Sequence, residues 1–496
     1  MAFADVFYHC SREQRHQVSW YWRFTHDTDS VRADPTLGGP ELRGNRFRRS
    51  PSFKRVVSIA ADMAAAPNQS LPTQCADWPD LKAAYRFLNH PDVTPERIQG
   101  THRQQTRQLC QKHKLILAIE DCTELDFTSH PATEGLGPIG DGHGRGILQH
   151  STLAATPDGH VLGVLHQIFR NRVPAKEGET RRERRERPKE SDFWHESVEA
   201  VGALGPETRL VHVADRGGDD FSMMVACGHH EVGFLVRAQH DRCINDGTNK
   251  LWSYMEAQAI AGDRDVPVPA RDGQPARVAR LAVRFSRVRL DPPKGDPRFQ
   301  EPLEVWVVSV IEENPPKNIE AIEWMLLTSE AISSREQACE RVDWYACRWV
   351  IEEWHKAEKT GCRLEASQLK DAEAIRCLAS FIAVIAVRML QLRDLAQMAT
   401  VSPVKGRNSS ADRPEALRAV VPYSWLIVVA HLATCRPEKL TPRQFWLTIA
   451  KRGGFIGRKG DGLPGWQTIW RGWYDVMMMV RGVEMCTPHP DAETYG

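Results

Sequence analysis

The stretch LILAIED, residues 115–121, is a short apolar run that ends in a carboxylate. A run of this length that follows no helical period is typical of a buried β-strand. Residues 209–215, RLVHVAD, repeat the pattern and again end in Asp. Between them, residues 149–155 and 160–169 predict two further strands, joined by the hairpin turn Thr156-Pro157-Asp158-Gly159. We therefore predict an α/β sheet that contains a hairpin and has helical crossovers.

Two carboxylates, Asp121 and Asp215, stand where two of these predicted strands end. An α/β sheet gathers its functional groups at the carboxyl ends of its strands, and carboxylate oxygens are ligands that hard divalent cations prefer. Strands also end in Asp at ordinary turns, so either residue alone is weak support for catalysis. Asp121 and Asp215 indicate a catalytic site only if a third carboxylate accompanies them.

A third carboxylate lies in DWYACRWVIEEWHKAEKTGCRLEA, residues 343–366, which reads as a helix. Tyr345, Arg348, Glu352 and Lys359 are spaced so that they share one helix face. The alternative interpretation is a polar stripe of helical ion pairs, such as Arg348 with Glu352. Three apolar side chains interleave with the stripe: Trp349, Ile351 and Trp354. The pattern predicts a helix packed on a core, with one edge that carries the chemistry.

Helical patterns precede the first strand, at residues 53–65 and within residues 81–98. Asn89-His90-Pro91 interrupts the second pattern, and Thr94-Pro95-Glu96 begins the next helix as cap, first turn and acidic residue. We predict a small helical domain over residues 36–105. The preceding residues, 1–35, carry little apolar periodicity and predict an atypical or disordered extension.

The region after Asp215 changes character twice. Residues 230–330 are rich in β-branched runs and predict a β-rich insertion. Residues 334–395 read as helical. The polar segment 402–412 predicts a linker, and residues 413–496 are again helical in pattern.

Length and composition bound the class of protein. The chain of 496 residues is too long for one ordinary core and predicts two to four folding units. Its 41% hydrophobic and 26% charged residues are typical of a soluble globular protein. We see no apolar run that approaches the roughly 20 residues of a membrane-spanning helix, and no signal peptide. These features predict a cytoplasmic protein with no membrane partner.

Cysteine spacing and charge add little. The 12 cysteines form no C-x-x-C pair and no zinc-finger spacing, which favours reduced, structural thiols. The net charge of +1 is no general argument for nucleic acid. Basic residues do gather at 43–55 and 181–189, where they could neutralise phosphates. For the second stretch, with its interleaved Glu183 and Glu186, a solvated face is an equally good interpretation.

The Tyr-x2-Arg-x3-Glu-x6-Lys spacing of residues 345–359 resembles the signature of bacterial insertion-sequence DDE transposases of the YREK group, to which the Tn-five transposase belongs. Five segments in the family's order carry the resemblance. They are similar to the N-terminal DNA-binding segment, the first-Asp strand, the second-Asp motif, the strand before the catalytic helix and the C-terminal tail. In that order they are AAYRFLNHPDVTPERI (83–98), AIEDCTEL (118–125), VADRGGDDF (213–221), EENPPKNIEAIEWMLLTSE (312–330) and IAKRGGFIGRKGDGLPGWQTIWRGW (449–473).

The resemblance covers residues 60–475 and implies an architecture. The fold would be α/β, with a ribonuclease-H-like catalytic core over residues 106–400 that holds the β-rich insertion. A helical DNA-binding domain would occupy residues 36–105, and a helical dimerisation domain residues 413–496.

The resemblance also implies that Asp121, Asp215 and Glu352 are the catalytic and metal-binding residues. They would hold two Mg²⁺ ions, for which Mn²⁺ is a plausible substitute. Asp121 would bridge the ions, and Asp215 and Glu352 would each complete one site. Two such ions stabilise charge on both the attacking and the leaving oxygen of a phosphodiester.

A further set of residues would hold DNA. By resemblance, Tyr345, Arg348 and Lys359 contact phosphate near the cut. Trp324 matches the family position that stacks on a flipped nucleotide, and a core aromatic is the alternative interpretation. Six other side chains could face DNA: Arg145, His150, Arg216, Arg237, His355 and Lys356.

The implied activity is cut-and-paste DNA transposition, in which the transposon ends are cut through a hairpin and joined to target DNA. The partners would be terminal inverted repeats, target DNA and a second copy of the chain in a synaptic complex, near the bacterial nucleoid. Two other functions stay open: a simple metal-dependent nuclease, and a catalytically inactive DNA-binding protein derived from a transposase. A lost acidic residue would mark the latter, and none of the three is lost.

Overall fold

The computed structural model describes residues 59–486, except 61, 65, 76, 181–182, 185–186, 246, 269–276, 318, 399–412, 419–420 and 459–463. The predicted extension at 1–35, the basic stretch 43–55 and the linker 402–412 lie outside the described residues. The chain divides into two compact units. The sheet unit comprises residues 103–129 and 136–353; the helical unit comprises the described residues before 103, residues 130–135 and the described residues after 353.

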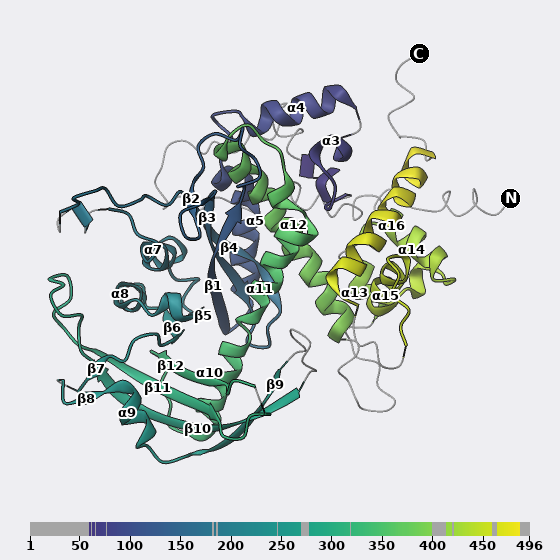
Figure 1. Ribbon diagram of the computed structural model, residues 1–496. Coiled ribbons are helices and arrows are strands. Elements are labelled where there is room, and N and C mark those ends of the chain that lie inside the picture. Colours follow the sequence, from purple (N-terminus) through teal and green to yellow (C-terminus); the bar gives the residue numbers. More distant parts are fainter. Residues whose placement is uncertain are drawn as a thin grey trace. The chain divides into compact units, whose positions relative to one another are not determined.

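A single mixed sheet of 12 strands organises the described part of the sheet unit (Figure 1). Its strand order is β2-β3-β1-β5-β6-β12-β11-β10-β7-β8, with β4 beside β3 and β9 beside β10. The strands are β1 (Leu115–Asp126), β2 (Gly137–Ile139), β3 (Gly144–Ala155), β4 (Val161–Arg170), β5 (Arg209–Ala214), β6 (Gly233–Arg237), β7 (Cys243–Ile244), β8 (Asn249–Lys250), β9 (Gly262–Val268), β10 (Arg277–Leu290), β11 (Leu303–Glu312) and β12 (Glu323–Thr328).

Only the centre of the described sheet is parallel. β5 pairs in parallel with both β1 and β6, and the other described pairs are antiparallel. The predicted hairpin is confirmed as β3 and β4, with the turn glycine Gly159 at a φ of +87°. The predicted strand at 209–214 coincides with β5. A mixed α/β fold is therefore confirmed.

One strand boundary is wrong in the sequence analysis. The strand predicted to end before Asp121 runs on to Asp126, so Asp121 lies in the middle of β1. The cause is the neighbouring strand. β1 stays paired with β3 as far as Asp126, although its described pairs with β5 end at Ile119. An apolar run marks only the buried part of a strand, and the tertiary partner extends it.

The predicted β-rich region, residues 230–330, continues the same sheet. β6 and β12 join its central strands, because β6 pairs with both β5 and β12. From there β11 and β10 pair along most of their length, with Val308 opposite Phe285. The strands of this region thus reach back to the strand that ends beside Asp215.

Helices cover the sheet within its own unit. They are α7 (Asp192–Val201), α8 (Phe221–His229), α9 (Leu251–Glu256) and α10 (Arg335–Ala346). α7 and α8 lie side by side (Figure 1), and Trp194, Val198 and Met223 bury their side chains in the core beside Val236 of β6. This core fixes the strands that carry Asp121 and Asp215.

The helical unit takes its members from both ends of the described chain. They include α3 (Leu71–Gln74), α4 (Trp78–Leu88), α12 (Ala372–Met398), α13 (Pro414–Arg418), α14 (Tyr423–Leu432), α15 (Pro442–Arg452) and α16 (Trp466–Cys486). The boundary between the units falls within α5 (Pro95–Cys110) and α11 (Trp349–Lys356). The predicted interruption at residues 89–91 and the helix start after Thr94 are confirmed by the end of α4 and the start of α5.

α12 corrects the expectation that no apolar segment reaches membrane-spanning length. It is the one described helix that is long and apolar enough to cross a membrane, over Ala372–Ala396. Its most apolar window is 78% buried within the protein, as in the core helix of a globular domain. Phe381 of α12 packs on Phe87 of α4, with ring centroids 6.2 Å apart.

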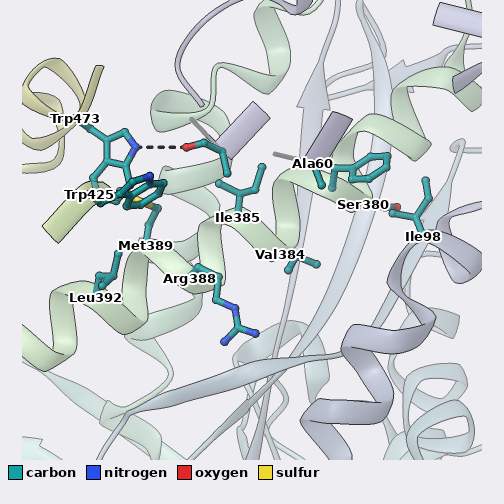
Figure 2. Close-up of a pocket in the computed structure, with 12 residues that line it drawn as sticks. Ala60, Ile98, Ser380, Val384, Ile385, Arg388, Met389, Leu392, Trp425 and Trp473 are labelled. Carbon is teal, nitrogen blue, oxygen red and sulfur yellow. Dashed lines mark hydrogen bonds between the residues drawn. The ribbon is translucent and has the colours of Figure 1, made fainter. Parts of the chain in front are cut away.

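A small apolar cavity of about 30 Å³ lies among segments of the helical unit (Figure 2). Ala60 and Ala64 line it from the N-terminal side, Val384 from α12 and Trp473 from α16. The indole Nε1 of Trp473 donates a hydrogen bond to the Ala64 carbonyl at 3.4 Å, and its ring meets Trp425 edge-on. Segments that are some 400 residues apart in sequence therefore form one core.

Candidate active site

Asp121 lies on β1, and Asp215 directly follows β5, the neighbouring parallel strand of the sheet unit. The last described pair of β1 and β5 is Ile119 with Val213, and each carboxylate lies two residues further along the chain, Asp215 with an extended backbone just beyond the end of β5. Side chains two residues apart on a strand share a face, and neighbouring strands are about 4.8 Å apart. Asp121 and Asp215 therefore face the same way, at the same level of the sheet.

Glu352 joins this pair from α11. Burial raises the pKa of Asp121 to about 6. The Arg348 guanidinium opposes that rise, while the negative charges of Asp215 and Glu352 add to it. Asp215 and Glu352 are thus both close enough to Asp121 for their charges to act on it. A carboxyl held by burial and by like charges in this way is typical of a functional site.

Arg348 lies between two of the carboxylates. One of its guanidinium nitrogens is 2.5 Å from Oε1 of Glu352, and another is 3.9 Å from Oδ2 of Asp121. Its side chain is 15% exposed, against 19% for Asp121 and 31% for Glu352. Within the described residues, no three carboxylate, imidazole or thiol groups converge closely enough to hold a metal ion as they are placed.

The predicted continuous helix over residues 343–366 is wrong. α10 ends at Ala346 and α11 begins at Trp349, and the backbone between them forms a tight turn. There the N–H groups of Arg348, Val350 and Ile351 donate to carbonyls three residues earlier, instead of four. α11 then ends in a π-helical turn, Ala357–Gly361. Tyr345, Arg348, Glu352 and Lys359 therefore occupy four successive segments.

The apolar residues of α11 differ in burial. Ile351 and Trp354 are fully buried, as predicted, and the Trp354 indole donates to the Ala383 carbonyl at 3.0 Å. Trp349 is 38% exposed, so its expected place in the core is wrong. It is the first residue of α11, directly after the tight turn.

An aromatic and basic group lies beside the carboxylates. The Trp324 ring on β12 meets the Tyr345 ring edge-on at 4.9 Å, and Trp324 is half-buried. Arg237 on β6 donates to the Glu323 carbonyl at 2.8 Å and hydrogen-bonds Tyr345. Burial raises the pKa of Tyr345, so its hydroxyl stays protonated and can donate a hydrogen bond. Trp324, Arg237 and Tyr345 therefore form one connected group.

The turn after β5 holds Asp215. The N–H of Gly217 donates to Oδ1 of Asp215 at 2.8 Å, as the cap of a short 3₁₀ turn. A Cβ on Gly217 would lie 2.8 Å from the Trp194 ring, so this position needs glycine for a close approach. Arg216, in the same turn, is exposed to solvent.

The next two acidic residues of this motif serve the fold. Asp219 is 5% exposed and accepts hydrogen bonds from the N–H groups of Gln239 and His240 and from the Arg242 side chain. Asp220 caps α8 by accepting from the N–H of Ser222 at 2.7 Å. The motif therefore offers Asp215 alone to the candidate site.

A buried polar cluster lies on the opposite face of β1. Glu120 accepts hydrogen bonds from Nε2 of His150 at 3.2 Å and from Nδ1 of His212, and all three side chains are fully buried. The possibility that His150 faces DNA is therefore wrong. Burial opposes ionisation of Glu120, but the two imidazoles outweigh it and lower its pKa to about 2. Strand alternation places Glu120 behind Asp121, and its histidines come from β3 and β5.

Three other predicted DNA contacts belong to the helical unit. His355 is 7% exposed and packs against the Trp354 ring at 5.2 Å, so its imidazole is not presented to solvent. Lys356 is exposed. Lys359 lies in the π-helical turn, 3.5 Å from Oε1 of Glu365, with a quarter of its side chain exposed.

The described part of the basic stretch 181–189 pairs with local acids. Arg187 lies 2.8 Å from Oε1 of Glu179, and Glu183 accepts hydrogen bonds from the N–H and hydroxyl of Thr180. Nearby, Arg172 is paired with both Glu124 and Glu190. These pairings favour the interpretation of this stretch as a self-neutralised surface, although four of its residues lie outside the described part.

Comparison with known proteins assigns the two ends of the chain. Residues 48–93 match the family described as transposase DNA-binding, and residues 429–492 match the Tn5 transposase dimerisation domain. Among solved structures, the chain is similar to the piggyBac transposase in a cryo-EM synaptic complex with hairpin DNA. That similarity is weak, with 10% identity and a TM-score of 0.34 over 76% of this chain and 75% of the other. The two family matches, at opposite ends of the chain, support a Tn5-like transposase.

Proposed function

We propose that the protein is a cut-and-paste DNA transposase of the DDE type, with Asp121, Asp215 and Glu352 as catalytic carboxylates on a ribonuclease-H-like core. The observation that carries the proposal is the placement of Asp215 and Glu352 close enough to the largely buried Asp121 for both charges to act on it: burial raises the pKa of Asp121 to about 6, and the two carboxylates add to that rise. The DNA-binding and dimerisation matches support the two partners that such a reaction needs, DNA and a second copy.

The donor set fits Mg²⁺. Its atoms are carboxylate oxygens, which Mg²⁺ prefers, and Mg²⁺ needs few protein ligands because it retains several waters. Asp121, Asp215 and Glu352 would hold the ions through their carboxylate oxygens. When bound, the two ions would activate the attacking hydroxyl and stabilise the leaving oxygen. Arg348 would compete with a metal ion for Glu352, because its guanidinium lies 2.5 Å from Oε1 of that carboxylate.

Arg348 then has a second role to take up. Released from Glu352, the guanidinium would keep its position near Asp121 and could pair with the phosphate that is cut. The protonated hydroxyl of Tyr345 would donate to another phosphate oxygen, and Arg237 would support it. Trp324 offers a flat ring beside this group, on which a base flipped out of the duplex would stack.

The proposed sequence of steps starts with water, which nicks one strand at the transposon end and frees a 3′-OH. That hydroxyl attacks a phosphodiester of the opposite strand, which forms a hairpin on the element and displaces the flanking strand; water then opens the hairpin and regenerates the 3′-OH. The 3′-OH then joins target DNA. Cutting two transposon ends together requires a dimer. Residues 429–492, which match a dimerisation domain, would form its contact.

The test is cleavage in vitro of a duplex that carries the DNA end flanking the gene. We expect cutting by the wild type in Mg²⁺ and none in Ca²⁺ or EDTA. The Glu352→Gln variant should keep end binding and lose cutting, because it preserves shape and removes a charged ligand. The matched control is Glu353→Gln, one residue away on the same helix, which should cut normally. Unchanged cutting by Glu352→Gln would remove Glu352 from the site.

A catalytically inactive DNA-binding protein derived from a transposase is the second candidate. One observation favours it: in the described residues the carboxylates do not converge as a ready metal site, and Glu352 is paired with Arg348. End binding by the wild type without any cutting, in Mg²⁺ or in Mn²⁺, would support this candidate over the first.

A further inference from the structure

The turn that follows α11 has an unusual form. Residues Ala357–Gly361 make a π-helical turn, in which the N–H of Cys362 donates to the Ala357 carbonyl five residues back at 2.8 Å. Turns of this kind are rare and occur mainly where a helix is distorted for a function. Lys359 lies within the turn, so the turn decides where its ammonium group points.

The π-helical turn packs directly against Trp470 of α16. A Cβ built on Gly361 would overlap the Trp470 indole, so the backbone of the turn lies directly on this ring. Trp470 is 3% exposed, and its indole nitrogen is buried with no hydrogen-bond partner among the described residues. An indole N–H usually finds a partner when it is buried. Its position here therefore follows from the packing of the ring on the turn.

Trp470 is itself held firmly. The Trp466 ring stacks on it with centroids 5.7 Å apart and an angle of 23° between the planes. The Arg393 guanidinium of α12 lies over the other indole, 5.4 Å from the Trp466 ring centre. Stacked aromatic rings with a cation over one of them resist displacement more than aliphatic contacts do. All these residues belong to the helical unit.

This packing joins two functions. α16 lies within residues 429–492, which match the dimerisation domain, whereas Lys359 belongs to the turn that follows the helix of Glu352. A shift of α16 would therefore be transmitted by Trp470 to Gly361, and from there to the lysine two residues earlier. Within the sequence alone, 111 residues separate Lys359 from Trp470, and nothing links them.

We propose that Trp470 is a positioning residue for Lys359, through which the dimerisation domain sets the contact of Lys359 with a phosphate of the transposon end. Trp470 does not touch DNA in this proposal. The inference rests on the proposed function, because it takes Lys359 to be a phosphate contact.

The test measures the salt dependence of end binding by the full-length protein, with a duplex that carries the transposon end. Each phosphate neutralised adds about 0.9 to the slope of log K against log salt concentration. Lys359→Gln should lower the slope by about that amount. Trp470→Leu should lower it equally, and the double variant should lower it no further. Gly361→Ala, which presses on Trp470 from the other side, should have the same effect.

Trp446→Leu is the matched control, because Trp446 meets Trp466 edge-on at 6.0 Å and stands one ring further from the turn. It should lose stability like Trp470→Leu and keep the wild-type slope. Thermal unfolding and sedimentation accompany every variant, so that a loss of folding or of dimers is separated from a loss of one phosphate contact. Should Trp470→Leu fail to fold, Gly361→Ala and Trp470→Phe replace it.

The outcomes separate the two levels of the proposal. If Lys359→Gln leaves the slope unchanged, the phosphate contact of Lys359 is wrong, and the role of Trp470 falls with it. If Lys359→Gln lowers the slope while Trp470→Leu and Gly361→Ala do not, only the inference about Trp470 is wrong. A further loss of slope in the double variant would also overturn it, since independent sites add and coupled sites do not.

Discussion

Glu120 and Asp121 are neighbours on β1, yet the two faces of the strand treat them in opposite ways. Burial keeps the pKa of Asp121 at about 6, on the face that also carries Asp215. Two imidazoles lower the pKa of Glu120 to about 2, on the face behind it. An acid surrounded by like charges is suited to bind cations, whereas an acid satisfied by two donors is suited to hold strands together. A carboxylate's role therefore depends on its partners.

The front carboxylate should matter for activity and little for folding. Asp121→Asn removes a charge that both metal ions would share, a loss of at least about 4 kcal/mol of transition-state stabilisation, or about 1000-fold in cleavage. The same change relieves repulsion with Asp215 and Glu352, so thermal stability should stay equal or rise. Cleavage of an end duplex in Mg²⁺ and thermal unfolding without metal measure the two effects. Wild-type cleavage by this variant would contradict the proposed site.

Glu120, the carboxylate on the opposite face of β1, should matter for folding and little for activity. Glu120→Gln leaves two buried imidazoles without the carboxylate that they face, and removal of one partner of a buried ionic group costs about 3 kcal/mol or more. Urea unfolding should show this loss. End binding should persist below the unfolding transition, because Glu120 faces away from the site. A normal stability with lost cleavage would mean that Glu120 acts in the chemistry instead of in the fold.

Much of this arrangement could be predicted from local sequence. The strand that ends before Asp215, the hairpin turn and the cap at Thr94 all depend on neighbouring residues, and the structure confirms them. The strand at Asp121 is confirmed in position, but its predicted end is wrong. The histidines of Glu120 could not be predicted in this way, because strand pairing brings them from β3 and β5. One feature of the sequence does indicate them. Glu120 precedes Asp121 in an apolar strand, so its side chain must point to the opposite, buried face and needs hydrogen-bond donors there.

The break between α10 and α11 could not be predicted from the sequence either. Residues 343–366 have a convincing helical period, and no Pro or Gly marks the change at Cys347 and Arg348. Backbone hydrogen bonds to carbonyls three residues back tighten the chain there, in a setting where Arg348 pairs with Glu352 and lies near Asp121. Helix propensity is a weak prior, which such tertiary contacts override. The same holds for the π-helical turn that carries Lys359.

The two carboxylates also predict opposite effects of pH on the metal-free protein. The folded pKa of Asp121, about 6, lies above its ordinary value of 3.8, so stability falls as pH rises from about 4 through 6. The folded pKa of Glu120, about 2, lies below 4.5, so its contribution is present above that value and is lost as pH falls towards 2. For Asp121 the change is at most about 3 kcal/mol. Denaturant titrations in EDTA should show it between pH 4 and 6.

Asp121→Asn is the variant that tests this assignment. It should flatten the stability of the metal-free protein between pH 4 and 6, and it should leave the acid limb below pH 4 unchanged, since that limb belongs to Glu120 and to other carboxylates. A slope that survives in Asp121→Asn would place the titrating group elsewhere.

Each face of the sheet also carries a tryptophan, and substitution of these residues should have the smallest effect of the changes considered. Trp324 is half-buried against Tyr345, whereas Trp194 is 5% exposed and packs edge-on against His150. Trp324→Ala should slow hairpin formation about tenfold relative to first-strand nicking, since base stacking on an aromatic ring contributes about 1–3 kcal/mol. Trp194→Phe should affect both steps equally, through stability. Single-turnover assays that resolve the nicked and hairpin products measure this ratio. An equal loss in both steps for Trp324→Ala would make it a packing residue, like its counterpart on the rear face.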